Sequence, residues 1–152
     1  MRKLFLLLPL LIVTACTQFG LYSETIKGFD NNRWEKNDTK SFSFQINEDV
    51  DKANLEILFS HVHEPGYDKV PVEITFKKAD GSEEIIKTDL LLTDVNGKSY
   101  SECIGDVCDL EQTVKENFTL AKGDYTITIS NTTNLPYLPN VIALGIGVET
   151  AE

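Results

Sequence analysis

The sequence predicts an all-β protein, a single antiparallel β-sandwich of about seven or eight strands that follows an N-terminal signal peptide and a tether. Three observations carry this prediction. Apolar residues recur at every second position in several short segments. Glycine-containing turn pairs separate these segments. No window shows a sustained helical period, and the 152 residues are enough for one domain of ordinary size once a signal peptide is removed.

The first fifteen residues have the layout of a secretory signal peptide. Arg2 and Lys3 are basic, residues 4–13 are almost entirely apolar, and small residues lead to Cys16. The apolar stretch is too short to span a bilayer, which takes roughly 20 residues. Val13-Thr14-Ala15-Cys16 resembles the lipobox of bacterial lipoproteins. That resemblance implies cleavage before Cys16, diacylglycerol on its thiol, and a fatty acid such as palmitate on the new amine. The alternative is an ordinary signal peptide followed by a chance cysteine.

We expect three segments: residues 1–15 as the lipoprotein signal peptide, 16–39 as the lipidated N-terminus and tether, and 40–152 as the β-sandwich. The tether is polar and irregular, and Phe29 and Trp34 are expected to pack on the edge of the domain. Loss of the signal peptide leaves 12 basic and 24 acidic side chains, a net charge of −12. Such a chain has no basic surface for nucleic acid. Anionic lipid head groups would repel it, so the lipid must hold it to the membrane.

Alternation of apolar and polar residues predicts the strands one after another. The predicted strands cover residues 40–46, 55–61, 70–76, 85–92, 114–120, 125–129 and 141–148. Asp80-Gly81 predicts a hairpin turn, and Asn96-Gly97 predicts another. The last strand is apolar on both faces, which is typical of a central strand. Because such a strand would be a poor exposed edge, we expect the strands at the two ends of the domain to pair.

Cys103 and Cys108 remain once Cys16 carries lipid. An exported protein folds in an oxidising compartment, so a disulfide between the two is the default expectation. The bond would rigidify a local loop, and it would stabilise the domain modestly because the closed loop is short. A redox or metal role is the alternative, although neither a helix start nor a basic neighbour is there to activate a thiol.

Several segments of the domain match a known pattern. Phe42-Ser43-Phe44-Gln45-Ile46-Asn47-Glu48 is an opening strand that runs into an acidic turn, and Tyr67 lies between two further strands. The most specific features are Gly123-Asp124-Tyr125, the leucine-containing loop that follows it, and the glycine-punctuated strand 141–149. This layout resembles the gliding-motility lipoproteins called GldH. The resemblance implies a lipoprotein associated with gliding machinery or a related surface or secretion apparatus, with envelope proteins as partners. It supplies no catalytic residue.

Candidate catalytic and metal-binding residues form weak constellations. His61 and His63 lie two apart, so on a strand they share one face and could begin a metal site, but no third ligand can be named. The alternative is a pair of strand-end histidines. No Gly-X-Ser-X-Gly elbow supports a serine hydrolase, and acid pairs such as Glu83-Glu84 are typical of solvated turns. We therefore predict no catalytic residue, no metal and no cofactor, and a protein that is not an enzyme.

The best candidate for a contact surface is the loop that contains Leu135, Tyr137 and Leu138. Two prolines in this loop would hold the three side chains in a fixed, extended form, which lowers the entropy lost on binding. An alternative function is a lipid-anchored glycan-binding module for nutrient uptake, which predicts a concave aromatic patch. Thr17 rather than an aspartate follows the lipidated cysteine. By resemblance to sorting rules in other bacteria, this indicates the outer membrane.

Overall fold

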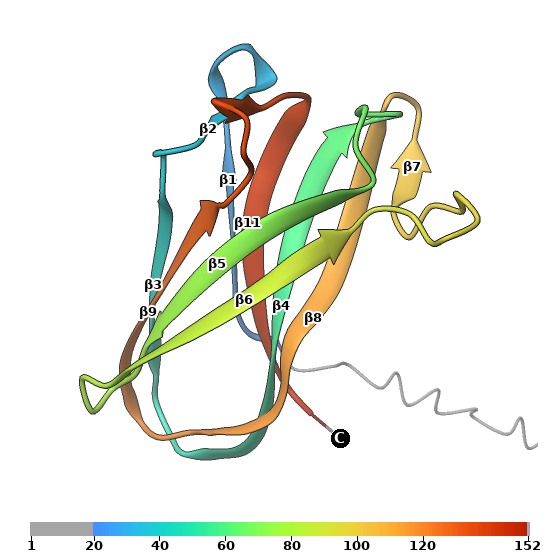
Figure 1. The fold of residues 1–152 in the computed structure, drawn as a ribbon. Coiled ribbons are helices and arrows are strands. Elements are labelled where there is room, and N and C mark those ends of the chain that lie inside the picture. Colours follow the sequence, from blue (N-terminus) through green and yellow to red (C-terminus); the bar gives the residue numbers. More distant parts are fainter. Residues whose placement is uncertain (1–19, 152) are drawn as a thin grey trace, which may run out of the picture.

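The computed structural model describes residues 20–151, which form two facing antiparallel sheets (Figure 1). The five-stranded sheet has the order β1-β11-β4-β8-β7, and the four-stranded sheet has the order β3-β9-β5-β6. A short ribbon of β2 and β10 lies across one end of the sandwich (Figure 1). The strands are β1 Gly20–Lys27, β2 Trp34–Glu35, β3 Lys40–Ile46, β4 Val50–Val62, β5 Lys69–Lys77, β6 Glu83–Leu91, β7 Glu102–Ile104, β8 Val107–Leu120, β9 Gly123–Asn131, β10 Tyr137–Leu138 and β11 Val141–Thr150, and a 3-10 turn covers Asp30–Asn32. The predicted β-sandwich is confirmed, with more strands than expected.

The core lies between the two sheets and is built by the alternation seen in the sequence. On β4, Leu55, Ile57 and Phe59 are fully buried, and their neighbours in sequence face outward. On β5, Ile74 and Phe76 do the same from the opposite sheet. Each large apolar side chain removed from water in this way stabilises the fold by roughly 1.5–3 kcal/mol. The apolar face of each strand therefore fixes its register, because a slip of one residue would turn that face toward solvent.

The closing strand β11 is central, as its apolar sequence predicts. It pairs with β1 on one side and with β4 on the other. The expectation that it pairs with the first predicted strand is wrong, because β3 belongs to the other sheet and pairs with β9. β1 takes that place instead.

The expectation of a tether up to residue 39 is wrong for residues 20–39. β1 pairs with β11 from Gly20 to Lys27, and the Tyr22 ring stacks on Phe44 with centroids 4.8 Å apart. Trp34 is fully buried rather than packed on an edge, and its Nε1 donates to the Asp38 carbonyl oxygen at 2.6 Å. Residues 20–39 are thus part of the sandwich. The signal peptide and Cys16 lie outside the described residues.

The two glycine turns have different outcomes. Asp80-Gly81 joins β5 to β6 in a hairpin, with Gly81 at φ 84°, so this turn is confirmed. Asn96-Gly97 also makes a turn, in which Gly97 N donates to the Asp94 carbonyl oxygen at 3.0 Å. A single bridge between Thr93 and Ser99 flanks it, in place of two strands. This turn therefore lies within a loop between β6 and β7.

The pairing order separates the sandwich into two ends. Gly20 pairs with Glu149, so the described chain begins and stops at one end. The other end, which we call the loop end, consists of residues 28–39, 63–68, 92–106 and 132–140 (Figure 1). Its loops are bonded to one another: Tyr67 donates its hydroxyl to the Pro139 carbonyl oxygen at 2.9 Å, and Asn140 Nδ2 donates to the Pro65 carbonyl oxygen at 2.9 Å. Lys36 N donates to the Pro136 carbonyl oxygen at 3.0 Å and Leu92 N donates to the Asp68 carbonyl oxygen at 2.8 Å, so all four segments of the loop end are connected.

Gly145 provides a test of how β1 is held. A Cβ at this position would lie 2.6 Å from the Glu24 carbonyl oxygen and from Thr25 Oγ1, so β1 would have to shift. We expect Gly145→Ala to lower the free energy of unfolding by about 1–3 kcal/mol, measured by urea denaturation.

Gly147→Ala is the matched control, because a Cβ there would meet its nearest neighbour, Glu56 Oε2, at an ordinary 3.6 Å. Equal stability losses in the two variants would show that close approach of β1 is not what requires glycine at position 145.

Candidate functional site

The structure divides the three candidate contact residues of the proline-containing loop. Leu138 is 2% exposed and pairs with Trp34 between β10 and β2, so it belongs to the core and its assignment to a contact surface is wrong. Tyr137 is half-buried, and the Arg33 guanidinium lies 4.3 Å from its ring centroid. Leu135 is 54% exposed. Of the three candidates, Leu135 and the exposed part of Tyr137 are thus the ones that a partner can reach.

The predicted disulfide is confirmed and lies at the loop end. Cys103 and Cys108 are directly opposed in the β7–β8 hairpin, with an S–S distance of 2.01 Å. Beyond the disulfide, Ile104 and Val107 form the last pair of the hairpin, and Gly105 takes φ 62° in the turn. The turn is also held from outside, because His63 N donates to the Asp106 carbonyl oxygen at 2.8 Å.

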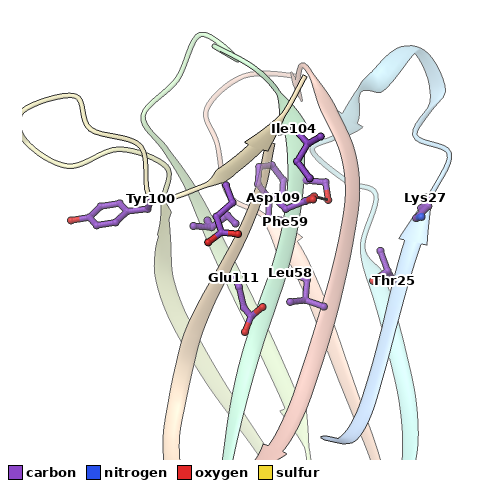
Figure 2. Close-up of a pocket in the computed structure, with 11 residues that line it drawn as sticks. Thr25, Lys27, Leu58, Phe59, Tyr100, Ile104, Asp109 and Glu111 are labelled. Atoms are coloured by element: carbon purple, nitrogen blue, oxygen red, sulfur yellow. Dashed lines mark hydrogen bonds between the residues drawn. The ribbon is translucent and has the colours of Figure 1, made fainter. Parts of the chain in front are cut away.

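A pocket of about 630 Å³ lies beside this hairpin on the outer face of the five-stranded sheet (Figure 2). Its floor is the outward-facing side of β4 and β8, and its walls are the hairpin on one side and β1 on the other. Figure 2 shows Ile104 above Asp109 on the hairpin side, with Thr25 and Lys27 across the sheet. The lining residues are Thr25, Lys27, Leu58, Phe59, Ser60, Tyr100, Glu102, Ile104, Asp109, Leu110 and Glu111.

Sequence reasoning missed this pocket, because its residues come from separate strands and share no local motif. Pairing brings them together: Leu58 lies opposite Glu111, and Ser60 lies opposite Asp109. Glu102 of β7 lies on the other side of Asp109. The sequence does show that the polar residues of each alternating strand face outward. It does not show which strands are neighbours in the sheet.

The charge of the pocket is predominantly negative. Glu102, Asp109 and Glu111 line it together with one basic residue, Lys27. Asp109 Oδ1 accepts a hydrogen bond from Ser60 Oγ at 2.5 Å. Within residues 20–151, none of the three carboxylates forms an ion pair, whereas carboxylates of the opposite sheet do, as in Lys87–Glu73 at 3.0 Å.

Farther down the same face, Glu56 has a perturbed acidity. Its pKa is raised to about 7, first by burial, then by a hydrogen bond and repulsion from Glu111, and then by repulsion from Glu149. At neutral pH its carboxyl group is therefore divided between protonated and ionised forms. Glu56, Glu111 and Glu149, which we call the Glu56 cluster, extend the negative charge of the pocket along the sheet.

The histidines are not brought together as a metal site. His61 is 3% exposed and faces inward, whereas His63 is exposed in the next loop. The His61 ring donates from Nδ1 to the Val62 carbonyl oxygen at 2.8 Å and accepts at Nε2 from Ser101 Oγ at 2.9 Å. Burial lowers the pKa of His61, so the neutral ring links β4 to the segment before β7. Among residues 20–151 no group of His, Cys, Asp and Glu has an arrangement suited to a metal ion.

The His61–Ser101 pair has the atoms of a nucleophile and a base, but not their setting. Both side chains are buried, so the hydroxyl does not face the pocket. The second ring nitrogen donates to a backbone carbonyl rather than to a carboxylate that could stabilise a charged ring. The pair is best explained as a structural contact.

The fold and this surface define a single-domain β-sandwich that presents a rigid loop end and an acidic sheet face. A model of the GldH lipoprotein family matches residues 21–148. The chain therefore belongs to the GldH lipoprotein family. Membership of a lipoprotein family implies a membrane-anchored place in the cell envelope. Within residues 20–151 no helix is long and apolar enough to cross a membrane.

Likenesses to solved structures are weaker. A crystal structure of a protein from Sulfurospirillum deleyianum has 13% sequence identity and a TM-score of 0.43, with 86% of this chain and 98% of that chain covered. Dimeric latent PorU from Porphyromonas gingivalis has 11% identity and a TM-score of 0.36, with 91% of this chain and 14% of that chain covered. No curated protein matches the chain. Likenesses this weak do not transfer a function.

The raised pKa of Glu56 gives a pH-dependent prediction. An acid whose pKa is higher in the folded than in the unfolded state binds its proton more tightly when folded, so stability falls as the pH rises from 4.5 to about 7. We expect Glu56→Gln to be more stable than the unaltered protein at pH 8, by roughly 1 kcal/mol after allowance for partial exposure. The difference should vanish near pH 4, and thermal unfolding across this range measures it.

Glu116→Gln serves as the control, because Glu116 is an exposed acid on β8 outside the Glu56 cluster. A stability gain at pH 8 that is the same for both variants would be an effect of net charge, and it would contradict the local burial and repulsion described for Glu56.

Proposed function

We propose that this chain is a non-enzymatic lipoprotein of the outer membrane that assembles with other envelope proteins in a gliding-motility apparatus or a related surface or secretion apparatus. The observation that carries the proposal is the GldH family match, which spans nearly the whole sandwich, including the loop end. It is supported by the rigid loop end, since bonded loops present a surface that loses little entropy on binding.

The position of β1 supports a close attachment to the membrane. Thr17, Gln18 and Phe19 separate Cys16 from the first residue of β1. At no more than about 3.6 Å per residue, the step from Cys16 to Gly20 spans about 14 Å at most. A lipid on Cys16 would thus confine the domain to the membrane surface, where a raised effective concentration allows weak contacts to suffice.

A glycan-binding role has less support. It requires a concave aromatic surface, and the aromatic residues that line the described pocket are Tyr100 at its rim and Phe59, whose side chain is fully buried in the core. Sugar binding is therefore the result to look for if no protein partner is found.

The anchor is tested by metabolic labelling with a palmitate analogue in the native bacterium. We expect the unaltered protein to carry the label and to sediment with outer membranes, because two or more acyl chains hold a protein stably. Cys16→Ser should lose both label and membrane association. Cys103→Ser with Cys108→Ser is the matched control, and it should keep both. Label retained in Cys16→Ser would contradict lipidation at that residue.

Assembly is tested by crosslinking the tagged protein in the intact envelope and identifying captured proteins by mass spectrometry. We expect enrichment of motility or secretion proteins over a tagged envelope protein of unrelated fold. Leu135→Asp should reduce the enrichment if the proline-containing loop contributes, since Leu135 is exposed and its change leaves the core intact. Enrichment of glycan-uptake proteins alone, or of nothing, would refute the assembly proposal.

A further inference from the structure

We propose that the disulfide-linked β7–β8 hairpin and the pocket beside it form a docking surface for a protein segment that carries a lysine or arginine flanked by apolar side chains. The proposal rests on the assembly function proposed above and names the surface and the chemistry of the partner.

Exposed apolar side chains gather at this corner of the molecule. Among residues 20–151, seven large apolar side chains are exposed, and five of these lie on the end of β6, the loop after it and the hairpin. These five are Leu91, Val95, Tyr100, Ile104 and Val107. Val95 is fully exposed and Ile104 is 88% exposed, which is costly in water unless a partner covers them. A second hollow, lined in part by Leu91 and Tyr100, continues the large pocket toward β6.

The backbone that holds these side chains is fixed. The Cys103–Cys108 disulfide closes the hairpin, and the loop before it is held by Asp94, whose Oδ1 accepts from Asn96 N and Lys98 N at 2.8 Å each. Tyr100 N donates to the Leu92 carbonyl oxygen at 2.8 Å. Exposed apolar side chains on a rigid backbone are the arrangement of a binding surface, because ordering them on association costs little entropy.

The charge next to the apolar corner selects the partner. Glu102, Asp109 and Glu111 have no ion pair among the described residues, and Lys27 lies on the far wall. On the outer face of the four-stranded sheet, by contrast, Lys69 pairs with Asp89 at 2.6 Å. A cationic side chain in the pocket would neutralise this local charge, whereas an acidic partner would be repelled.

The position of the surface fits a protein partner rather than the lipid to which the chain is anchored. Across the sheet, Gly20 of β1 lies opposite Glu149 of β11, which lies opposite Asn54 of β4. Cys108 of the hairpin lies opposite His61, farther along β4. Asn54 and His61 are seven residues apart on β4, so at about 3.4 Å per residue Gly20 and the hairpin are separated by about 24 Å along the strand direction. When β1 is perpendicular to the membrane, the hairpin therefore lies farther from the lipid than the short connection to Cys16 can reach. The acidic pocket would also be repelled by anionic lipid.

Fluorescence anisotropy measures the proposed binding directly. The probe is a short labelled peptide in which lysine alternates with leucine, compared with the same peptide carrying glutamate in place of lysine. We expect the full sandwich to bind the lysine peptide more tightly, with affinity falling as salt rises. Ile104→Asp should weaken binding about tenfold or more, and so should Glu102→Gln combined with Glu111→Gln.

Two matched controls separate the site from general stickiness. Ile85 is 60% exposed on β6, away from the pocket lining, so Ile85→Asp should leave binding unchanged. Glu83→Gln removes an exposed acid from the same strand and should also have no effect. The proposal would be overturned if the controls lost as much affinity for the lysine peptide as the hairpin variants do. It would also be overturned if the glutamate peptide bound as tightly as the lysine peptide.

The same variants in the envelope crosslinking experiment show which of the two proposals fails. If the unaltered protein and Ile85→Asp enrich motility or secretion proteins but Ile104→Asp does not, and the crosslinked partner segment contains lysine or arginine, both proposals stand. Undiminished enrichment with Ile104→Asp would overturn the hairpin surface while assembly stands. Peptide binding with no enrichment of such proteins would leave the surface intact and refute the proposed apparatus.

Discussion

The rest of the structure depends on the central place of β11 in the five-stranded sheet. Val141, Leu144, Ile146 and Val148 bury their side chains in the core, and β1 and β4 take up the hydrogen bonds on its two sides. This pairing places Gly20, the first described residue, beside the last strand. It also places the loop of residues 132–140, which leads into β11, at the opposite end of the sandwich. Gly145 is part of the same constraint, because it admits the β1 backbone at a distance that a side chain would not allow. The separation of the end that holds Gly20 from the loop end is thus a consequence of the position of β11.

The fold could be predicted where the signal is local. Strands such as β5, with Val70, Val72, Ile74 and Phe76 in strict alternation, are recognisable because each inward residue is large and apolar. β1 was missed because its stretch Leu21-Tyr22-Ser23-Glu24-Thr25-Ile26 is mostly polar, and the strand that it pairs with, β11, lies more than a hundred residues later in the sequence. Leu138 was misplaced for a similar reason. The prolines beside it indicate a loop, but its burial depends on Trp34, about a hundred residues earlier.

For the site, too, only the features that depend on residues close in sequence could be predicted. The disulfide was predictable, because Cys103 and Cys108 are close in sequence and an exported chain meets an oxidising compartment. The pocket was not, because Leu58, Ser60, Asp109 and Glu111 are neighbours across β4 and β8 only after the register is known. His61 shows the converse, since its type suggests chemistry whereas its burial and two hydrogen bonds give it a structural role.

Ion pairs are distributed unequally between the outer faces of the two sheets, which supports the binding surface proposed above. Neighbouring carboxylates that lack a cationic partner repel one another, and farther down this face the pKa of Glu56 is raised first by burial and then by Glu111 and Glu149. On the other sheet Lys87 lies opposite Glu73 and pairs with it, and Lys69 pairs diagonally with Asp89, so the strands of this chain readily accommodate ion pairs. Departures from local stability of this kind concentrate at functional surfaces. Here Glu102, Asp109 and Glu111, which form no ion pair within residues 20–151, lie beside the exposed apolar side chains of Ile104 and Tyr100. The proposed basic and apolar partner would neutralise these carboxylates and cover the apolar side chains beside them.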